Sequence, residues 1–256
     1  MHLGFIGTGT LTAAVIAGLQ GSGVRHSIHV SPRSEVTSIA LAKRFEHVIR
    51  APSNDAVVEQ SDVVFLAVRP AQVETALNGI DFRPDQILVS FVTGLSMKEL
   101  GSFAPRSTVC RILPLPMIEH CKGPIVCHPA HPAMVELFSR IGDLVCVDSE
   151  QELLAFGRAS AFMSTYFELQ YSIIRWLESQ GMGRYRAALY VRSMLAGLAD
   201  TALRTSDDAY EELAQHHETK GGLNERVRRN LLELGWFEQP IRAFDELQHL
   251  QRTELD

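Results

Sequence analysis

The sequence has little of several features that would indicate particular classes of protein. Its apolar runs stay well below the ~18 consecutive residues that a membrane-spanning helix needs. The N-terminal residues do not form a secretory leader, because Gly7 and Gly9 interrupt the only apolar candidate and no basic segment precedes it. We therefore expect a globular, cytoplasmic protein of enzyme size.

Cysteine is scarce, and basic residues form no block. Four cysteines in 256 residues make no disulfide framework, and their spacing to histidines matches no paired-ligand pattern of zinc sites. We expect reduced thiols and no metal. The 24 basic and 30 acidic residues give a formal charge of −6, which offers no footprint for nucleic acid. The expected partner is a small molecule.

The first dozen residues carry the clearest signal that is present. The apolar run 3–6 leads into Gly7-Thr8-Gly9, and apolar residues with helical spacing follow from Leu11 to Leu19. Glycines between a strand and a helix let backbone N–H groups approach a pyrophosphate at the helix N-terminus. Thr12 stands where the dinucleotide-binding fingerprint has its third glycine, so an ordinary strand-to-helix turn stays open as an alternative.

Short apolar runs alternate with helical patterns through residue 148, as in a parallel sheet covered on both faces. The sequence predicts an α/β protein with a Rossmann-type domain at 1–148 and an all-helical substrate and dimerisation domain at 149–256. Eight strands are expected, at about 2–7, 27–31, 47–50, 62–68, 86–92, 108–113, 124–128 and 143–147.

The second domain begins with a capping box, Ser149 and Glu152, and one long helix is expected from there to about Leu177. Its apolar residues cover most of its circumference. We infer that a second subunit covers part of it in a homodimer, the alternative being burial within one chain. Further helices are expected at 184–204, at 207–217, from a cap at Asn224 to Gly235, and from about Pro240.

The end of the second predicted strand bears on which dinucleotide binds. NAD-binding domains place a carboxylate there for the ribose 2′-hydroxyl, whereas this chain has Ser31, Arg33 and Ser34. All three can donate to a 2′-phosphate, and Arg33 can do so bidentately. This favours NADP(H). The alternative is that Arg33 is a solvated residue at a helix start.

Five segments together resemble the pyrroline-5-carboxylate reductase family: 4–9 (GFIGTG), 31–33 (SPR), 61–70 (SDVVFLAVRP), 111–116 (RILPLP) and 219–224 (TKGGLN). The resemblance extends over essentially the whole length. It implies a Rossmann-type domain, a helical dimerisation domain, and NAD(P)H-dependent reduction of a cyclic imine to proline.

The resemblance also implies a cofactor site and a substrate site. The cofactor residues are Gly7, Thr8, Gly9, Thr10, Leu11, Ser31, Arg33, Ser34, Asn54, Ala67, Val68, Arg69, Pro70, Thr93 and Gly94. Thr93 and Gly94 are expected near the nicotinamide, and Asn54 near the adenosine half. Without the resemblance, Pro70 is also typical of a helix start and Asn54 of a helix cap.

The substrate site departs from the family pattern. Leu115 replaces a common asparagine, and 219–224 replaces a run of serine, proline, two glycines and two threonines. Gly221 and Gly222 remain, so backbone N–H groups can still hold a carboxylate. The candidate substrate contacts are Leu115, Gly221, Gly222 and Leu223, and the candidate catalytic residues are Thr219, Lys220 and Asn224. The alternative for Lys220 is a solvated loop lysine, which is the commoner situation because lysine side chains are usually exposed.

Two alternatives to the imine reductase remain. A β-hydroxyacid dehydrogenase has a similar plan but normally needs a lysine on the long helix, and residues 150–178 contain none. A non-catalytic NADP(H)-binding sensor or scaffold is suggested by Leu115 and Leu223.

Overall fold

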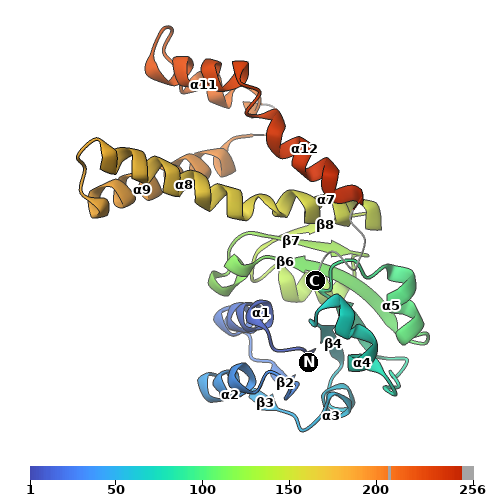
Figure 1. Cartoon of the computed structure of the whole chain (residues 1–256). Coiled ribbons are helices and arrows are strands. Elements are labelled where there is room, and N and C mark those ends of the chain that lie inside the picture. Colours follow the sequence, from blue (N-terminus) through green and yellow to red (C-terminus); the bar gives the residue numbers. More distant parts are fainter. Residues whose placement is uncertain (207–208, 250–256) are drawn as a thin grey trace. The chain divides into compact units, whose positions relative to one another are not determined.

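The computed structural model describes residues 1–206 and 209–249, which form two compact units, 1–157 and 158–249 (Figure 1). Each unit is treated by itself. The described residues include no helix that is long and apolar enough to cross a membrane.

The first unit is built on one eight-stranded sheet with strand order β3-β2-β1-β4-β5-β6-β7-β8. All eight predicted strands are confirmed. They are β1 (His2–Ile6), β2 (Ser27–Val30), β3 (Val48–Arg50), β4 (Val63–Leu66), β5 (Ile87–Ser90), β6 (Thr108–Pro114), β7 (Pro124–His128) and β8 (Asp143–Cys146).

The strands are parallel except for β7, which runs antiparallel to β6. The predicted Rossmann-type parallel sheet is thus confirmed except for this one antiparallel pair. A parallel pair needs a crossover of a dozen or more residues, and β6 and β7 are joined only by η2 (Pro116–His120) and a short turn. The chain consequently reverses instead of crossing the sheet.

Helices cover both faces of this sheet, so the central strands β1, β4 and β5 are buried on both sides. One face packs around Phe5, Phe65 and Phe138, and the other around Leu66, Leu88 and Leu100. The covering elements are α1 (Thr10–Gly21), α2 (Glu35–Arg44), α3 (Asn54–Glu59), η1 (Pro70–Gln72), α4 (Val73–Leu77), α5 (Met97–Phe103) and α6 (Pro132–Phe138). This is the predicted Rossmann-type arrangement.

The long helix expected after residue 149 is divided in two. The Ser149–Glu152 capping box is present, with the Glu152 N–H donating to Ser149 Oγ at 3.2 Å. The helix α7 (Glu150–Ser160) ends where the Ala161 N–H donates to the Arg158 carbonyl, three residues back, and α8 (Phe162–Ser179) follows. A single helix through this region was therefore a wrong prediction.

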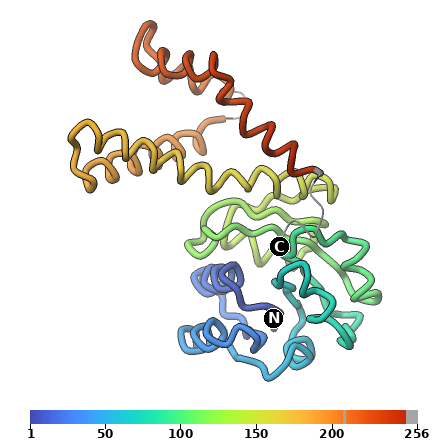
Figure 2. Tube along the Cα trace, viewed as in Figure 1, coloured from blue at the N-terminus to red at the C-terminus, as the bar shows by residue number. Residues whose placement is uncertain are grey.

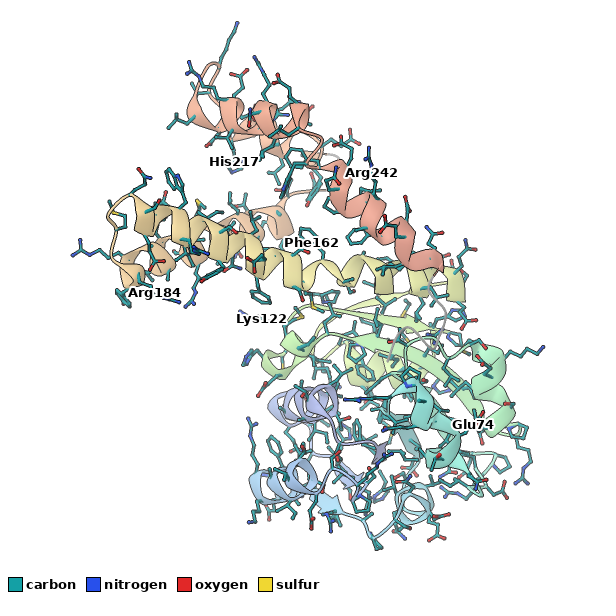
Figure 3. All side chains as sticks on the ribbon, in the orientation of Figure 1. Glu74, Lys122, Phe162, Arg184, His217 and Arg242 are labelled. Carbon is teal, nitrogen blue, oxygen red and sulfur yellow. The ribbon has the colours of Figure 1, made fainter. Side chains whose placement is uncertain are left out.

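In the second unit, α8 lies beside α9 (Arg184–Arg204), as the trace in Figure 2 shows. Figure 3 labels Phe162 and Arg184 where these helices begin. The prediction for 184–204 is confirmed, whereas only Leu213–His216 (α10) is α-helical in the described part of 207–217, and 207–208 lie outside the described residues. The helices α11 (Leu223–Glu233) and α12 (Glu238–Glu246) and the short η4 (Leu247–His249) complete the unit.

Asn224 does not cap α11, because Gly222 occupies the N-cap position. Asn224 lies inside the first turn, and its side-chain amide donates to the His217 carbonyl at 2.8 Å. The sequence suggested a cap at Asn224 because asparagine is a common N-cap residue. The tight turn at the two glycines instead puts the N-cap at Gly222, two residues before the predicted one.

Two histidines, one just before β2 and one within it, make the stability of this unit depend on pH. Burial lowers the pKa of His26 and of His29, with smaller contributions from the N-terminal ammonium group and from His2 respectively. Unfolded histidine has a pKa of about 6.5, so the unfolded state binds more protons below that value. Stability is expected to be constant above about pH 7 and to fall as the pH drops through 6.5.

Urea unfolding at several pH values tests this expectation. His29→Gln should flatten the loss of stability between about pH 7 and pH 5, while the exposed His120→Gln should retain the wild-type slope. Equal slopes for wild type and His29→Gln would contradict it.

Candidate active site

The glycine turn after β1 is fixed by its own packing. Gly7 has φ +100°, and a Cβ placed on it would lie 2.3 Å from the Ala67 carbonyl oxygen. A Cβ on Gly9, in contrast, would meet nothing within 4 Å. Gly7 is therefore needed for the turn itself, whereas Gly9 faces open space at the start of α1.

Three hydroxyl residues surround this turn. Ser31 Oγ accepts the Gly7 N–H at 2.9 Å, and Thr12 Oγ1 donates to the Gly7 carbonyl at 2.8 Å. Thr12 thus secures the turn at the position of the missing third glycine. Thr8 Oγ1 is buried without a hydrogen-bond partner among the described residues. Ser31, predicted to face the cofactor, is itself buried and supports the turn.

The loop after β2 presents exposed polar residues. Arg33 and Ser34 are both solvent-exposed. Arg50, at the end of β3, reaches this loop: its side chain donates to Ser38 Oγ at 3.0 Å and to the Pro32 carbonyl at 3.3 Å. Sequence reasoning missed Arg50 because a charged residue at the end of a short strand forms no motif. In the sheet Arg50 pairs with Val30, at the start of this loop.

The loops after β4 and β5 leave the same edge of the sheet. Pro70 is the first residue of η1, which is the helix-start position that its residue type also suggested. Val68 and Arg69 directly precede it. Ser53 caps α3, so Asn54 is not the cap, and Asn54 Nδ2 donates to the Ala76 carbonyl at 3.0 Å. Thr93 is exposed after β5, followed by Gly94 with φ +73°.

An ion pair between a buried arginine and a partly exposed glutamate holds the segment that follows Gly94. Arg111 on β6 is 4% exposed, and its guanidinium lies 2.6 Å from Glu150 Oε1. The same oxygen accepts the Met97 N–H at 2.8 Å, at the start of α5. Sequence reasoning missed this pair, because its partners are 39 residues apart.

The edge formed by these loops fits a dinucleotide. It lies at the carboxyl ends of β1, β2, β4 and β5, and β1 and β4, its central pair, mark the point where the strand order reverses. Ligands of such sheets bind at that point. The N-cap of α1 is Gly9, with no side-chain cap among the described residues, so its first N–H groups are available to a pyrophosphate. Leu115 follows β6 at the same edge and is half-buried.

The tight turn before α11 requires glycine at both positions, 221 and 222. The Gly222 N–H donates to the Thr219 carbonyl at 2.7 Å, Gly221 has φ +73°, and a Cβ on Gly222 would lie 2.8 Å from that carbonyl oxygen. Thr219, Lys220, Leu223 and Asn224 are exposed, Leu223 by 81%.

One acidic residue that the sequence reasoning missed closes this loop. The Gly221 N–H donates to Glu225 Oε2, and Arg229 donates to Glu225 Oε1 at 2.6 Å. The Arg226 side chain donates to the Gly221 carbonyl at 3.0 Å. A glutamate three residues after the helix N-cap is the signal that could have identified it.

Two of the four cysteines, Cys110 and Cys127, are buried. The four cysteines are free, and burial raises the pKa of Cys110 to about 11 and that of Cys127 to about 12, which keeps both protonated at neutral pH. No group of three metal-ligating side chains occurs among the described residues.

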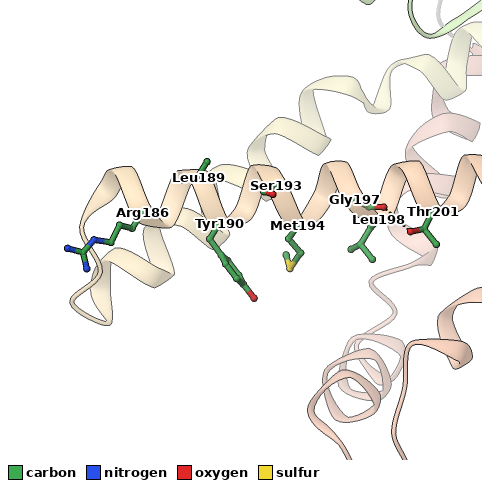
Figure 4. Close-up of a pocket in the computed structure, with 8 residues that line it drawn as sticks. All are labelled: Arg186, Leu189, Tyr190, Ser193, Met194, Gly197, Leu198 and Thr201. Atoms are coloured by element: carbon green, nitrogen blue, oxygen red, sulfur yellow. Dashed lines mark hydrogen bonds between the residues drawn. The ribbon is translucent and has the colours of Figure 1, made fainter.

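An apolar groove runs along α9 (Figure 4). Tyr190, Met194 and Leu198 project from one side of the helix and are exposed. On α8, Phe167 and Trp176 are 65% and 60% exposed. The helical unit therefore does not bury these faces by itself.

This chain is similar to known proteins in sequence and in structure. A family model described as "NADP oxidoreductase coenzyme F420-dependent" matches residues 2–94. Pyrroline-5-carboxylate reductase 2 of Rattus norvegicus is 31% identical over 188 residues, 64% of this chain and 58% of that protein. The matched part thus spans less than two thirds of that relative.

Longer matches have lower identity. The pyrroline-5-carboxylate reductase of Vibrio alginolyticus is 26% identical over 249 residues, covering 90% of this chain and 89% of that protein. A solved structure of Plasmodium falciparum pyrroline carboxylate reductase with NADP bound superposes with a TM-score of 0.82 at 17% identity, covering 96% of this chain and 95% of that one. That likeness establishes the fold.

Proposed function

We propose that the chain is a member of the pyrroline-5-carboxylate reductase family and that it is an NADPH-dependent oxidoreductase, which reduces the C=N bond of a cyclic imine. The observation that carries the proposal is the turn at Gly7 and Gly9, which presents uncapped N–H groups to open space at the reversal point of the sheet.

The proposed cofactor site uses the loops at this edge. Backbone groups of 7–11 hold the pyrophosphate, and the loops at 67–70 and 93–94 line the remainder, with Asn54 toward the adenosine half. NADPH supplies the hydride. The protein's contribution is to orient the imine carbon and exclude water, since an imine that enters protonated is already electrophilic.

Arg33 is expected to select NADPH over NADH. Its exposed guanidinium can pair with a 2′-phosphate, and a charge-assisted hydrogen bond contributes about 1.5–3 kcal/mol. Arg33→Ala should therefore weaken NADPH binding roughly 10- to 100-fold and leave NADH binding nearly unchanged. Calorimetry with both nucleotides measures this, with the exposed Arg25→Ala as a control. Equal losses for the two nucleotides would refute the assignment.

The substrate we put first is 1-pyrroline-5-carboxylate, reduced to proline, or a related imino acid. In this proposal Leu115, Gly221, Gly222 and Leu223 contact the substrate, and Thr219, Lys220 and Asn224 are the candidates for polar contact or proton donation. The exposed positions of Thr219, Lys220, Leu223 and Asn224 support their availability to a ligand.

NADPH oxidation followed by absorbance tests the function. Addition of 1-pyrroline-5-carboxylate or of other cyclic imines should oxidise NADPH, and a flat trace across the panel would reject a reductase. Tight NADPH binding without turnover would favour the sensor or scaffold alternative. Residues 150–178 contain no lysine, which counts against the β-hydroxyacid dehydrogenase.

We also propose a homodimer through the helical unit. The exposed apolar side chains of α8 and α9 support it, because large exposed apolar patches are typical of subunit interfaces. The division at 148/149 and the cytoplasmic location remain predictions.

A further inference from the structure

A second arginine reaches the loop that carries Arg33. Arg50 is the last residue of β3 and pairs in the sheet with Val30, the last residue of β2. The two strands are parallel, so both of their carboxyl ends lie at the edge where ligands of such sheets bind. The Arg50 guanidinium donates to the carbonyl of Pro32, the residue before Arg33. The fold therefore brings two cations that are distant in the sequence to the same loop.

The Arg50 side chain is anchored at two points. Its Nε donates to Ser38 Oγ on α2 at 3.0 Å, and its Nη2 donates to the Pro32 carbonyl at 3.3 Å. Ser38 is fully buried, whereas the Arg50 side chain is 35% exposed. Among the described residues Nη1 makes no hydrogen bond, so one edge of the guanidinium keeps its donors for a ligand. A side chain that is already ordered loses little entropy when it binds a ligand.

The charges around this loop favour an anion. Residues 31–38 and β3 contain two cations, Arg33 and Arg50, and one carboxylate, Glu35. Glu35 Oε1 lies 4.0 Å from Arg50 Nη2, which is too far for a hydrogen bond, and the Glu35 side chain is 72% exposed. An exposed pair of this kind is weak. A phosphate group has more charge and more acceptor oxygens than one carboxylate, so it competes well for the guanidinium.

We propose that Arg50 is a second specificity-determining residue for NADPH, and that its Nη1 edge contacts the 2′-phosphate together with Arg33. The inference rests on the proposed function and specifies its coenzyme site, and it involves only residues of the first unit. Arg50 supplies an anchored cation, and the exposed Arg33 supplies a cation that can adjust to the bound nucleotide. Selectivity over NADH is thereby divided between two residues.

Two variants of Arg50 separate its charge from its donor geometry. Arg50→Met keeps most of the apolar stem and removes the guanidinium, whereas Arg50→Lys keeps a positive charge without the planar fork of donors. Arg44→Met is the matched control. Arg44, the last residue of α2, is exposed and lies 3.7 Å from the Glu119 carboxylate, in a weak ion pair like that of Arg50 with Glu35.

Calorimetry with NADPH and NADH compares these variants with wild type, because the two nucleotides differ only in the 2′-phosphate. Arg50→Met should weaken NADPH binding about tenfold and change NADH binding less than about threefold. The retained NADH affinity also reports that the nucleotide site is folded. Arg50→Lys should recover part of the lost NADPH affinity, and Arg44→Met should match wild type.

The double variant Arg33→Ala/Arg50→Met distinguishes contact with the phosphate from mere positioning of Arg33. If Arg50 contacts the phosphate, the double variant should bind NADPH at least about threefold more weakly than Arg33→Ala alone. No further loss would mean that Arg50 acts only through Arg33, which would overturn the inference.

Equal losses of the two nucleotides in Arg50→Met, or an unchanged NADPH affinity, would also overturn it while leaving the proposed reductase intact. NADPH selectivity that depends on Arg50 supports the inference even where no imine is reduced, a result that would instead reject the proposed function. A wild-type protein that binds neither nucleotide would overturn both.

Discussion

Gly9→Ala is expected to weaken NADPH binding at least tenfold while the protein folds normally, and Gly7→Ala is expected to damage folding itself. Gly9 has φ −80°, which alanine adopts freely, and a Cβ there would meet nothing within 4 Å. The added methyl group would therefore project into the space where the pyrophosphate is proposed to lie, and a tenfold loss corresponds to about 1.4 kcal/mol.

Gly7 is constrained from two directions. Its φ of +100° is unfavourable for alanine, and a Cβ would lie 2.3 Å from the Ala67 carbonyl oxygen, a backbone atom that cannot rotate away. Such a conformation alone costs roughly 1–3 kcal/mol. Urea unfolding should show that loss for Gly7→Ala and a change below ~1 kcal/mol for Gly9→Ala.

Comparing Gly7→Ala with Gly9→Ala separates the effect on the turn from the effect on the bound cofactor. Urea unfolding measures the stability of each variant, and calorimetry measures its affinity for NADPH. Wild-type affinity in Gly9→Ala would mean that no pyrophosphate lies against this turn, and the cofactor site would have to be placed elsewhere.

The strands were predictable because burial on both faces leaves a strong trace in the sequence. The central strands β1, β4 and β5 are short apolar runs with breakers at their ends, and the predicted positions of all the strands agree with the structure to within about two residues. The orientation of β7 was not predictable from apolarity, since an apolar run has no direction. The connection 115–123 is too short for the crossover that a parallel pair needs, and this was the signal in the sequence that favoured an antiparallel β7.

The candidate site was only partly predictable, because hydrogen bonds between distant residues leave no local pattern. Ser31 looked like a phosphate donor from its place after the second strand, yet its oxygen accepts the Gly7 N–H. Glu225 and Arg50 likewise act through contacts that exist only after folding. The glycine pair at 221–222 was recognisable, but its immediate reason is the tight turn onto Thr219.

Breaking the Arg111–Glu150 pair is expected to have the largest effect on stability. Arg111 is 4% exposed, so Glu150→Ala would leave a buried guanidinium without its carboxylate and the Met97 N–H without its acceptor. Removing one partner of a buried pair typically costs about 3–5 kcal/mol. Urea unfolding should show a loss of this size for Glu150→Ala.

A second ion pair in the same unit provides the control. Arg106 and Asp81 are 2.8 Å apart, but both side chains are exposed, so Arg106→Ala should cost less than about 1 kcal/mol. The double variant Arg111→Met/Glu150→Ala should recover much of the loss, because it removes the unpaired buried charge. Similar losses for Glu150→Ala and Arg106→Ala would show that burial does not set the strength of the pair.

The Arg111–Glu150 pair should also affect the proposed cofactor site, because it positions the loop at Gly94 without contacting the cofactor itself. Glu150 holds the first N–H of α5, three residues after Gly94 in the loop proposed to face the nicotinamide. In Glu150→Gln the amide oxygen can still accept one hydrogen bond, so the protein should fold while the loop is held less firmly. We expect kcat with the imine to fall more than the affinity for NADPH, because the adenosine end of the cofactor contacts loops that this pair does not touch. A fall in NADPH affinity equal to the fall in kcat would instead indicate a general loss of structure.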